Sequence, residues 1–420
     1  MLDLVLCNTR LPDGRVADLA FKDGRLHHIG SAGRSHETID CRDLLCIPAA
    51  TDMHVHMRGG VQSAKEDWRF GTMAALAGGV TMVVDQPNTI PPLTTPELYR
   101  NRVKEAEAGA LCSFAVNGAV SPGSDLCSLW REGAMAFGEI FAAPSSYGDA
   151  LSLHELENAL TEIASLSALA TIHAEEVSPG SPGNLSQHHL SRSPEGEARS
   201  LHQIRRCIPK KMTVHVCHLS SPASLEDAPG SKEVTPHHLF LSLERFEPDN
   251  TYVKVNPPIR PESIRRSLFS LWDEIDIIAS DHAPHTRSDK DVAFADAPSG
   301  IPGVETMLPL LMNQVDKGSL SLSSVIRKTA VAPCRVLGIP PAGFLPGERA
   351  DFALYAMQPE PIVSENLHSK SGWTPFEGMK GIFPTMVICD GRVAYHDGNY
   401  SMEPGCWVNG RGYYRTRHIL

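Results

Sequence analysis

Two histidines placed two residues apart in a strand-like segment are the first candidates for chemistry in this sequence. His54 and His56 lie in the stretch TDMHVH, and residues two apart on a β-strand project from the same face. Two neutral imidazoles on one face can bind a single zinc ion. An isolated pair of this kind fits two half-buried structural histidines equally well, so its meaning depends on partners elsewhere in the chain.

Further side chains able to bind a metal stand at the ends of other strand-like segments. His173 closes ATIH, His218 closes VHVCH, and Asp281 follows the apolar run IDIIAS, where an unpaired carboxylate would be costly. Glu139 in AFGEIF could bridge two zinc ions through its two oxygens or form a salt bridge in the barrel. His215 lies three residues before His218, so we expect it to face away from the site. Together these residues predict a metal centre.

Three polar side chains near these ligands suit an anionic substrate. Arg58 follows the histidine pair with the same spacing, and a guanidinium group binds a carboxylate through two hydrogen bonds. Asn88 comes just after another strand-like segment, and His285 lies four residues beyond Asp281. The alternatives are a surface ion pair for Arg58, a turn residue for Asn88 and a loop residue for His285. We expect Arg58 to be the main contact.

Eight strand-like segments must position these side chains. They span residues 51–56, 81–88, 113–120, 134–141, 170–176, 212–221, 232–238 and 275–285. Helix-like stretches lie between most of them, which predicts an α/β fold with a parallel (β/α)8 TIM-type barrel. Catalytic residues of such barrels stand at the carboxyl ends of the strands, where the candidates are found. Residues 174–193, rich in Ser, Pro, Gly and His, predict a long loop over the barrel mouth.

Both ends of the chain show a different pattern. Short alternating segments are separated by turn signals, among them the Asp-Gly pairs at 23–24 and 390–391. This pattern predicts one small β-sheet domain built from both termini, residues 1–47 and 345–420. The barrel would then span residues 48–344.

The composition narrows the class of protein. Hydrophobic residues make up 42% of the 420 residues, and the formal net charge of −11 argues against a nucleic-acid surface. The ten cysteines form no C-x-x-C pair, which fits buried thiols in a reducing cytoplasm. The sequence has no apolar run of the ~18 residues or more that a membrane span needs. We therefore expect a cytoplasmic enzyme with no membrane contact.

The motifs, in their order along the chain, resemble those of the cyclic amidohydrolases. The resemblance covers most of the chain and rests on DMHVHMR, KEDWRFGTMAALAGGVTMVVDQPNT, TIHAEE, HVCHLSS, VTPHHL, VNPPIR, ASDHAPH, SGIPGVETMLPLL and SKSGWTPFEGMKGIFPTMVICDGRV. Within that family, Arg58 and the PNT at residues 87–89 are more similar to the dihydroorotases than to hydantoinase-like or allantoinase-like members.

The resemblance assigns roles to individual residues. It implies that His54 and His56 bind one zinc, that His173 and His218 bind the other, and that Asp281 binds the first zinc while moving protons. Arg58, Asn88 and His285 would hold the substrate carboxylate, with Asn256 and the Gly303 backbone as further contacts. Many relatives bridge their metals with a carboxylated lysine on the fourth strand, but here that segment has only Glu139. Glu139 is shorter, so the resemblance leaves open whether one or two zinc ions are bound.

The reaction implied is the reversible hydrolysis of (S)-dihydroorotate to N-carbamoyl-L-aspartate in pyrimidine (UMP) biosynthesis, with a zinc-bound hydroxide as nucleophile and Asp281 as general base and acid. The loop at 142–149 or that at 174–193 would close over the site. The alternatives are a hydantoinase-, dihydropyrimidinase- or allantoinase-type cyclic amidase and an inactive scaffold of the same fold. For its assembly, we consider a homo-oligomer or an association with aspartate transcarbamoylase.

Overall fold

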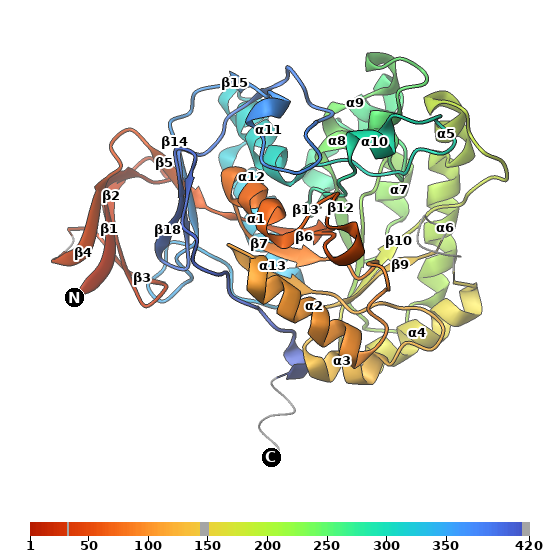
Figure 1. The fold of residues 1–420 in the computed structure, drawn as a ribbon, viewed down its shortest axis with the longest axis horizontal. Coiled ribbons are helices and arrows are strands. Elements are labelled where there is room, and N and C mark those ends of the chain that lie inside the picture. Colours follow the sequence, from red (N-terminus) through yellow and green to blue (C-terminus); the bar gives the residue numbers. More distant parts are fainter. Residues whose placement is uncertain (32, 143–150, 414–420) are drawn as a thin grey trace.

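The chain forms a sheet built from its two ends and an α/β barrel beside it (Figure 1). The computed structural model describes residues 1–31, 33–142 and 151–413. In Figure 1 the red N-terminal strands and the blue C-terminal strands lie together at the left, and the barrel with its helices fills the right. The predicted fold class, a barrel with a β-sheet made by both termini, is confirmed.

Among the described residues, nine strands form the terminal sheet. They are β1 (Leu2–Arg10), β2 (Val16–Lys22), β3 (Arg25–Ile29), β4 (Ser35–Asp40), β5 (Leu45–Pro48), β14 (Phe352–Tyr355), β17 (Met386–Cys389), β18 (Arg392–His396) and β19 (Asn399–Tyr400). Their order is β19-β18-β17-β14-β5-β1-β2-β3, with β4 paired to β1. Strand β5 pairs antiparallel with β14, with Phe352 opposite Pro48, and this pair joins the two ends of the chain. Phe21 and Phe352 pack in the sheet's own apolar core.

In the part of the chain that the structure describes, eight short parallel strands form the barrel. They are β6 (Ala50–Val55), β7 (Val80–Asp85), β8 (Ser113–Val116), β9 (Phe137–Phe141), β10 (Ala170–His173), β11 (Val214–Val216), β12 (Ser231–Val234) and β13 (Ile277–Ile278). Strands β6 to β8 form one sheet and β9 to β13 another. Single parallel bridges, Gly118 to Phe137 and Val55 to His282, join the two sheets at both edges. The ring therefore closes.

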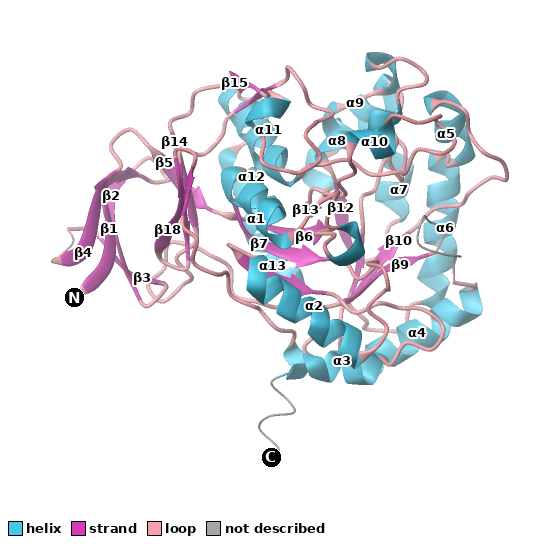
Figure 2. Cartoon of the chain, in the orientation of Figure 1, coloured by secondary structure: helices cyan, strands magenta, loops and turns pink. Residues whose placement is uncertain are grey.

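Helices surround these strands, as the cyan ribbons around the magenta strands show in Figure 2. They are α1 (Trp68–Ala77), α2 (Pro96–Gly109), α3 (Leu126–Glu132), α4 (Leu153–Ser165), α5 (Leu185–Ser191), α6 (Pro194–Cys207), α7 (Pro222–Asp227), α8 (Pro236–Phe240), α9 (Glu262–Ser270), α10 (Arg287–Lys290), α11 (Val304–Asp316), α12 (Leu322–Ile326) and α13 (Ala332–Leu337). Local signals start several of them: the Thr95 side chain accepts a hydrogen bond at the start of α2, and Pro96 follows it. Because helices cover the strands, strands such as β7 are buried along their whole length.

The segment 174–193 differs from the predicted loop. It contains helix α5, whose start is capped by the Asn184 side chain, and His188 within it is buried. The His188 Nε2 atom lies 3.0 Å from the Val255 carbonyl oxygen. A Ser- and Gly-rich composition therefore did not exclude a helix, because Asn184 supplies the cap and Leu185 an apolar anchor.

Parts of the C-terminal segment pack on the barrel. The Phe114 backbone N–H in β8 donates to the Cys406 carbonyl oxygen. Strands β15 (Glu360–Pro361) and β16 (Lys380–Gly381) form a separate pair, and Ile382 N–H donates to the Pro309 carbonyl of α11. The division of the chain into residues 1–47 with 345–420 and residues 48–344 stays a prediction.

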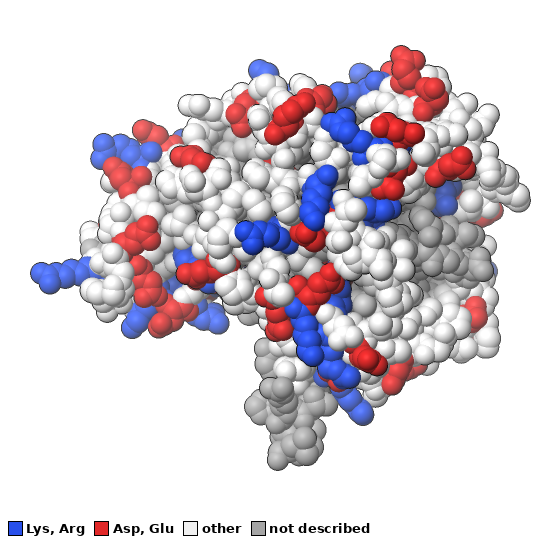
Figure 3. Space-filling model, in the orientation of Figure 1, with Lys and Arg blue, Asp and Glu red and all other residues white. Residues whose placement is uncertain are grey.

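The surface carries charges of both signs. On the face shown in Figure 3, acidic and basic side chains are interspersed over the barrel and the terminal sheet. Among the described residues, no helix is long and apolar enough to cross a membrane.

Candidate metal centre

The predicted metal ligands meet inside the carboxyl end of the barrel. His54 and Glu139 lie within β6 and β9, and His173 is the last residue of β10. His218 and Asp281 come just after β11 and β13, where both adopt positive φ angles of 38° and 47°. Such a backbone turn is unusual for residues other than glycine and is often found at functional sites.

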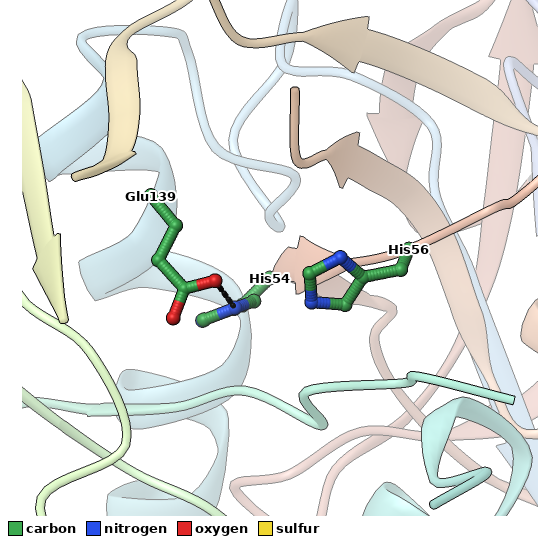
Figure 4. A group of neighbouring side chains, drawn as sticks. All are labelled: His54, His56 and Glu139. Carbon is green, nitrogen blue, oxygen red and sulfur yellow. Dashed lines mark ion pairs between the residues drawn. The ribbon is translucent and has the colours of Figure 1, made fainter. Parts of the chain in front are cut away.

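His54, His56 and Glu139 form the first group of ligand atoms, and Figure 4 shows the three side chains pointing toward one another. One atom from each residue lies within 4.8 Å of the others. The His54 Nε2 atom is 3.6 Å from Glu139 Oε2. Asp281 completes this group: its Oδ1 atom is 3.2 Å from His56 Nε2 and 3.5 Å from His54 Nε2.

Glu139, His173 and His218 form the second group. The Glu139 Oε1 atom lies 2.7 Å from His173 Nδ1 and 2.7 Å from His218 Nε2. Glu139 is therefore shared by both groups, with two histidines on either side. This is the arrangement that a carboxylate bridging two cations requires.

The donor set fits a divalent transition metal. All these side chains are buried, and imidazole nitrogens with carboxylate oxygens are typical zinc ligands. The His54 Nε2 atom is buried and has no hydrogen-bond partner among the described residues. Because a buried nitrogen without a partner is costly, a cation between these groups accounts for its position.

Charge in the cluster is strongly coupled. Burial raises the pKa of the Glu139 carboxyl, but hydrogen bonds with His173 and His218, together with the nearby His54, outweigh burial and hold that pKa well below its usual value. Burial lowers the pKa of His173, whereas its contacts with Glu139 and Glu175 raise it to about 9. Glu139 is thus a carboxylate, the form that binds metal.

Two carboxylates that hold the ligands were not identified from the sequence. Glu233 of β12 lies with its Oε1 atom 3.0 Å from His54 Nδ1 and accepts a hydrogen bond from the His218 backbone N–H. Glu175 lies with its Oε2 atom 2.7 Å from His173 Nε2. Such partners fix the orientation of metal-binding imidazoles. The sequence did contain a signal for Glu175. It follows His173 by two residues, the spacing that puts two side chains on the same face of a strand.

The prediction that His215 faces away from the site was wrong. His215 is buried and its Nε2 atom lies 2.9 Å from Glu233 Oε2. Strand β11 ends at Val216, and the backbone then turns at His218. Strand alternation therefore does not extend to His218, so both histidines face inward.

A pocket open to solvent adjoins the cluster. Its lining combines predicted metal ligands with predicted substrate contacts: His56, Arg58, Asn88, Glu139, Phe141, His173, Val255, Asn256, Asp281, Ala283, Ser299 and Gly300. Arg58 is buried, with 4% of its surface exposed, so the alternative of a surface ion pair is excluded. The pocket therefore places a guanidinium group beside the metal ligands.

The remaining predicted contacts differ in their surroundings. Asn88 Oδ1 lies 2.8 Å from His56 Nδ1, so Asn88 also orients a predicted metal ligand. His285 Nε2 lies 3.4 Å from Arg58 Nη2. The Gly303 backbone N–H donates to His282 Nδ1 and lines a neighbouring pocket. A substrate contact by Gly303 stays a prediction, and the closing loop predicted at 142–149 lies, beyond Ala142, outside the described residues.

Comparisons with known sequences point to one family. The sequence profile of the amidohydrolase family matches residues 45–394. The chain is 37% identical to the dihydroorotase of Methanosarcina acetivorans, over 96% of this chain and 94% of that protein. It is 35% identical to the dihydroorotase of Halobacterium salinarum, over 96% and 98% of the two chains.

Solved structures show the same fold. The L-hydantoinase (dihydropyrimidinase) of Arthrobacter aurescens superposes with a TM-score of 0.90 at 25% identity, covering 97% of this chain and 100% of that one. The dihydropyrimidinase of Brevibacillus agri gives a TM-score of 0.86 at 20% identity, covering 98% and 99%. The profile matches most of the chain, and the two dihydroorotases are more than 30% identical over nearly its full length, so the chain belongs to the amidohydrolase family.

Proposed function

We propose that this chain is a zinc-dependent dihydroorotase, which opens the ring of (S)-dihydroorotate to N-carbamoyl-L-aspartate and catalyses the reverse closure. The full-length relatives named dihydroorotase support this reaction. The observation that carries it is the buried Arg58 in the pocket lined by the metal ligands. The carboxylate of dihydroorotate can pair with the Arg58 guanidinium. Hydantoin and dihydrouracil rings carry no carboxylate for this pair.

His54, His56 and Asp281 would hold one zinc ion, His173 and His218 the other, and Glu139 both. Bound zinc supplies a Lewis acid that activates water and polarises the ring carbonyl. Two ions are proposed because Glu139 is shared by two groups of histidines.

Asp281 is proposed to move the proton. Its carboxylate lines the pocket and is 3.2 Å from His56. Burial raises the pKa of Asp281, but His56 and the other nearby histidines outweigh burial and lower it, so the group begins as a base. As water adds to the ring carbonyl carbon, Asp281 accepts the water proton and delivers it to the ring nitrogen when the carbon–nitrogen bond breaks.

Arg58, Asn88, Asn256 and His285 are proposed to hold the substrate. Arg58 and His285 bind the carboxylate, and Asn88 and Asn256 line the same pocket. This fixes which ring carbonyl meets the cluster, and such orientation contributes to catalysis by itself.

The test compares substrates and one arginine variant in zinc-loaded protein. We expect turnover of dihydroorotate to exceed that of dihydrouracil and hydantoin, and Arg58→Met to lower kcat/KM for dihydroorotate roughly 100-fold, because a charged hydrogen-bonding partner is lost. Arg69→Met, an exposed arginine in α1, is the matched control. If the protein prefers an uncharged ring, the hydantoinase-type alternative is favoured. If it turns over none of the three substrates and retains no zinc, the alternative of an inactive scaffold is favoured.

Location and assembly are proposals as well. We expect the enzyme in the cytoplasm, with small-molecule substrates and without nucleic acid. A homo-oligomer or an association with aspartate transcarbamoylase would show in light scattering of the purified protein, alone and mixed with that enzyme.

A further inference from the structure

A lysine contacts His285 on the side of the ring opposite Arg58. Lys65 Nζ lies 3.1 Å from His285 Nδ1. Lys65 is half-buried and also pairs with Asp289 at 3.6 Å. Asp289 is itself held by the Thr286 backbone and hydroxyl in the capping box of α10. Lys65 is therefore fixed in place, although it does not line the pocket beside the metal ligands.

The contacts of His285 indicate which of its ring nitrogens carries the proton. An ammonium group only donates hydrogen bonds, so His285 Nδ1 must accept one. Burial, together with Arg58, Lys290 and Lys65, lowers the pKa of His285 far below its usual value, so the ring is neutral. A neutral ring that accepts at Nδ1 carries its hydrogen on Nε2. The Nε2 atom lies 3.1 Å from the Ser299 carbonyl oxygen, which accepts that hydrogen until a carboxylate, the stronger acceptor, takes its place.

Two donors then stand side by side. His285 Nε2–H and the Arg58 Nη2–H group are 3.4 Å apart, and neither can accept from the other. A carboxylate can accept from both. The Lys65 ammonium and the Ser299 carbonyl oxygen thus favour the same tautomer, which puts the His285 hydrogen on Nε2 beside Arg58, and Lys65 is the contact that disfavours a hydrogen on Nδ1.

We propose that Lys65 is a positioning residue for carboxylate recognition, which holds His285 with its Nε2–H available to the acid group of the substrate. This inference rests on the proposed function for the identity of the acid. In this role Lys65 contributes to specificity for a ring that bears an acid group, and it does so through His285.

The kinetic test uses Lys65→Met, Lys65→Arg and the exposed Lys104→Met as control. We expect Lys65→Met to raise KM for dihydroorotate about tenfold, as for the loss of one charge-assisted hydrogen bond, with kcat nearly unchanged. Lys65→Arg, which still donates, restores most of the affinity, and Lys104→Met has no effect. An unchanged KM in Lys65→Met, or an equal loss in kcat, overturns the proposal.

A second measurement does not depend on turnover. In protein labelled with ¹⁵N-histidine, the His285 signal is identified by its loss in His285→Gln. We expect a protonated Nε2 and an unprotonated Nδ1 in the wild type and in Lys65→Arg, and a mixture of tautomers in Lys65→Met. A proton on Nδ1 in the wild type, or the same tautomer in Lys65→Met, refutes the proposal. If the wild type fails to hydrolyse dihydroorotate, the proposed function fails, while the ¹⁵N spectrum still decides the role of Lys65.

Discussion

Glu139 is the residue on which the geometry of the centre depends. Its Oε1 atom lies 2.7 Å from two histidines of the second group, and its Oε2 atom faces His54 of the first. A glutamate is shorter than a carboxylated lysine, and strand β9 brings it into the centre of the cluster. Although it is shorter than a carboxylated lysine, Glu139 therefore reaches both groups of histidines.

Asp281 gives the sharpest test at the scale of single residues. Asn in its place keeps the shape and one oxygen but cannot accept the proton, so we expect Asp281→Asn to lower kcat by roughly 10²–10⁴-fold. Asp296→Asn, at an exposed position, is the matched control. Hydrolysis rates under saturating substrate measure the effect. A kcat within a few fold of the wild type would remove Asp281 from proton transfer.

The sequence identified the residues of the cluster better than the residues that support them. His54, His56, His173, His218 and Asp281 could be found because they end strand-like segments. Glu233 could not, because its role depends on β12 lying beside β11 and on the turn at His218. Contacts between neighbouring strands are set by closure of the barrel, which no local pattern specifies.

At the scale of elements, helix α2 supports the loop that carries Arg58. Arg102 forms a buried ion pair with Asp85 at the end of β7, with Arg102 Nε 2.8 Å from Asp85 Oδ2. Arg102 Nη1 also donates to the Arg58 carbonyl oxygen, and Asp85 accepts from the Met57 N–H. Arg58 has a φ of 53°. The ion pair therefore stabilises an unusual backbone conformation next to the pocket.

Removing Arg102 should cost both stability and affinity. Arg102→Met leaves Asp85 buried without its partner, and we expect a loss of roughly 3–5 kcal/mol in the free energy of unfolding and a higher KM. Arg100→Met on the same helix breaks the partly exposed pair with Glu132, which should cost about 1 kcal/mol or less. Urea denaturation of both variants measures the difference. Equal losses would show that the buried pair has no special role.

The whole molecule combines a barrel, which carries the candidate metal centre, with a sheet built from strands of both ends of the chain. The broad division was visible in the sequence because the two regions differ in periodicity. The packing of the C-terminal segment on β8 was not, because it depends on a tertiary contact between Cys406 and Phe114. Helix α5 was missed because its Ser- and Gly-rich surroundings favoured a loop over the local cap at Asn184. Cation binding should link the strands of the barrel, since its ligands come from several of them.

Metal removal should therefore destabilise the fold. A ligand present at 100 times its dissociation constant stabilises the native state by about 2.7 kcal/mol. We expect a chelator to lower the melting temperature by several degrees and zinc to restore it. The Glu139→Gln variant should respond far less, because its bridge is neutral. The same zinc-dependent shift in both proteins would argue that the metal binds elsewhere.

Anomalous scattering at the zinc edge tests the central claim most directly. In a crystal of zinc-loaded protein, we predict two peaks, one between His54, His56 and Asp281 and one between His173 and His218, with a Glu139 oxygen bound to each. Absence of zinc from this cluster in fully loaded crystals, or two ions without Glu139 between them, would contradict the account.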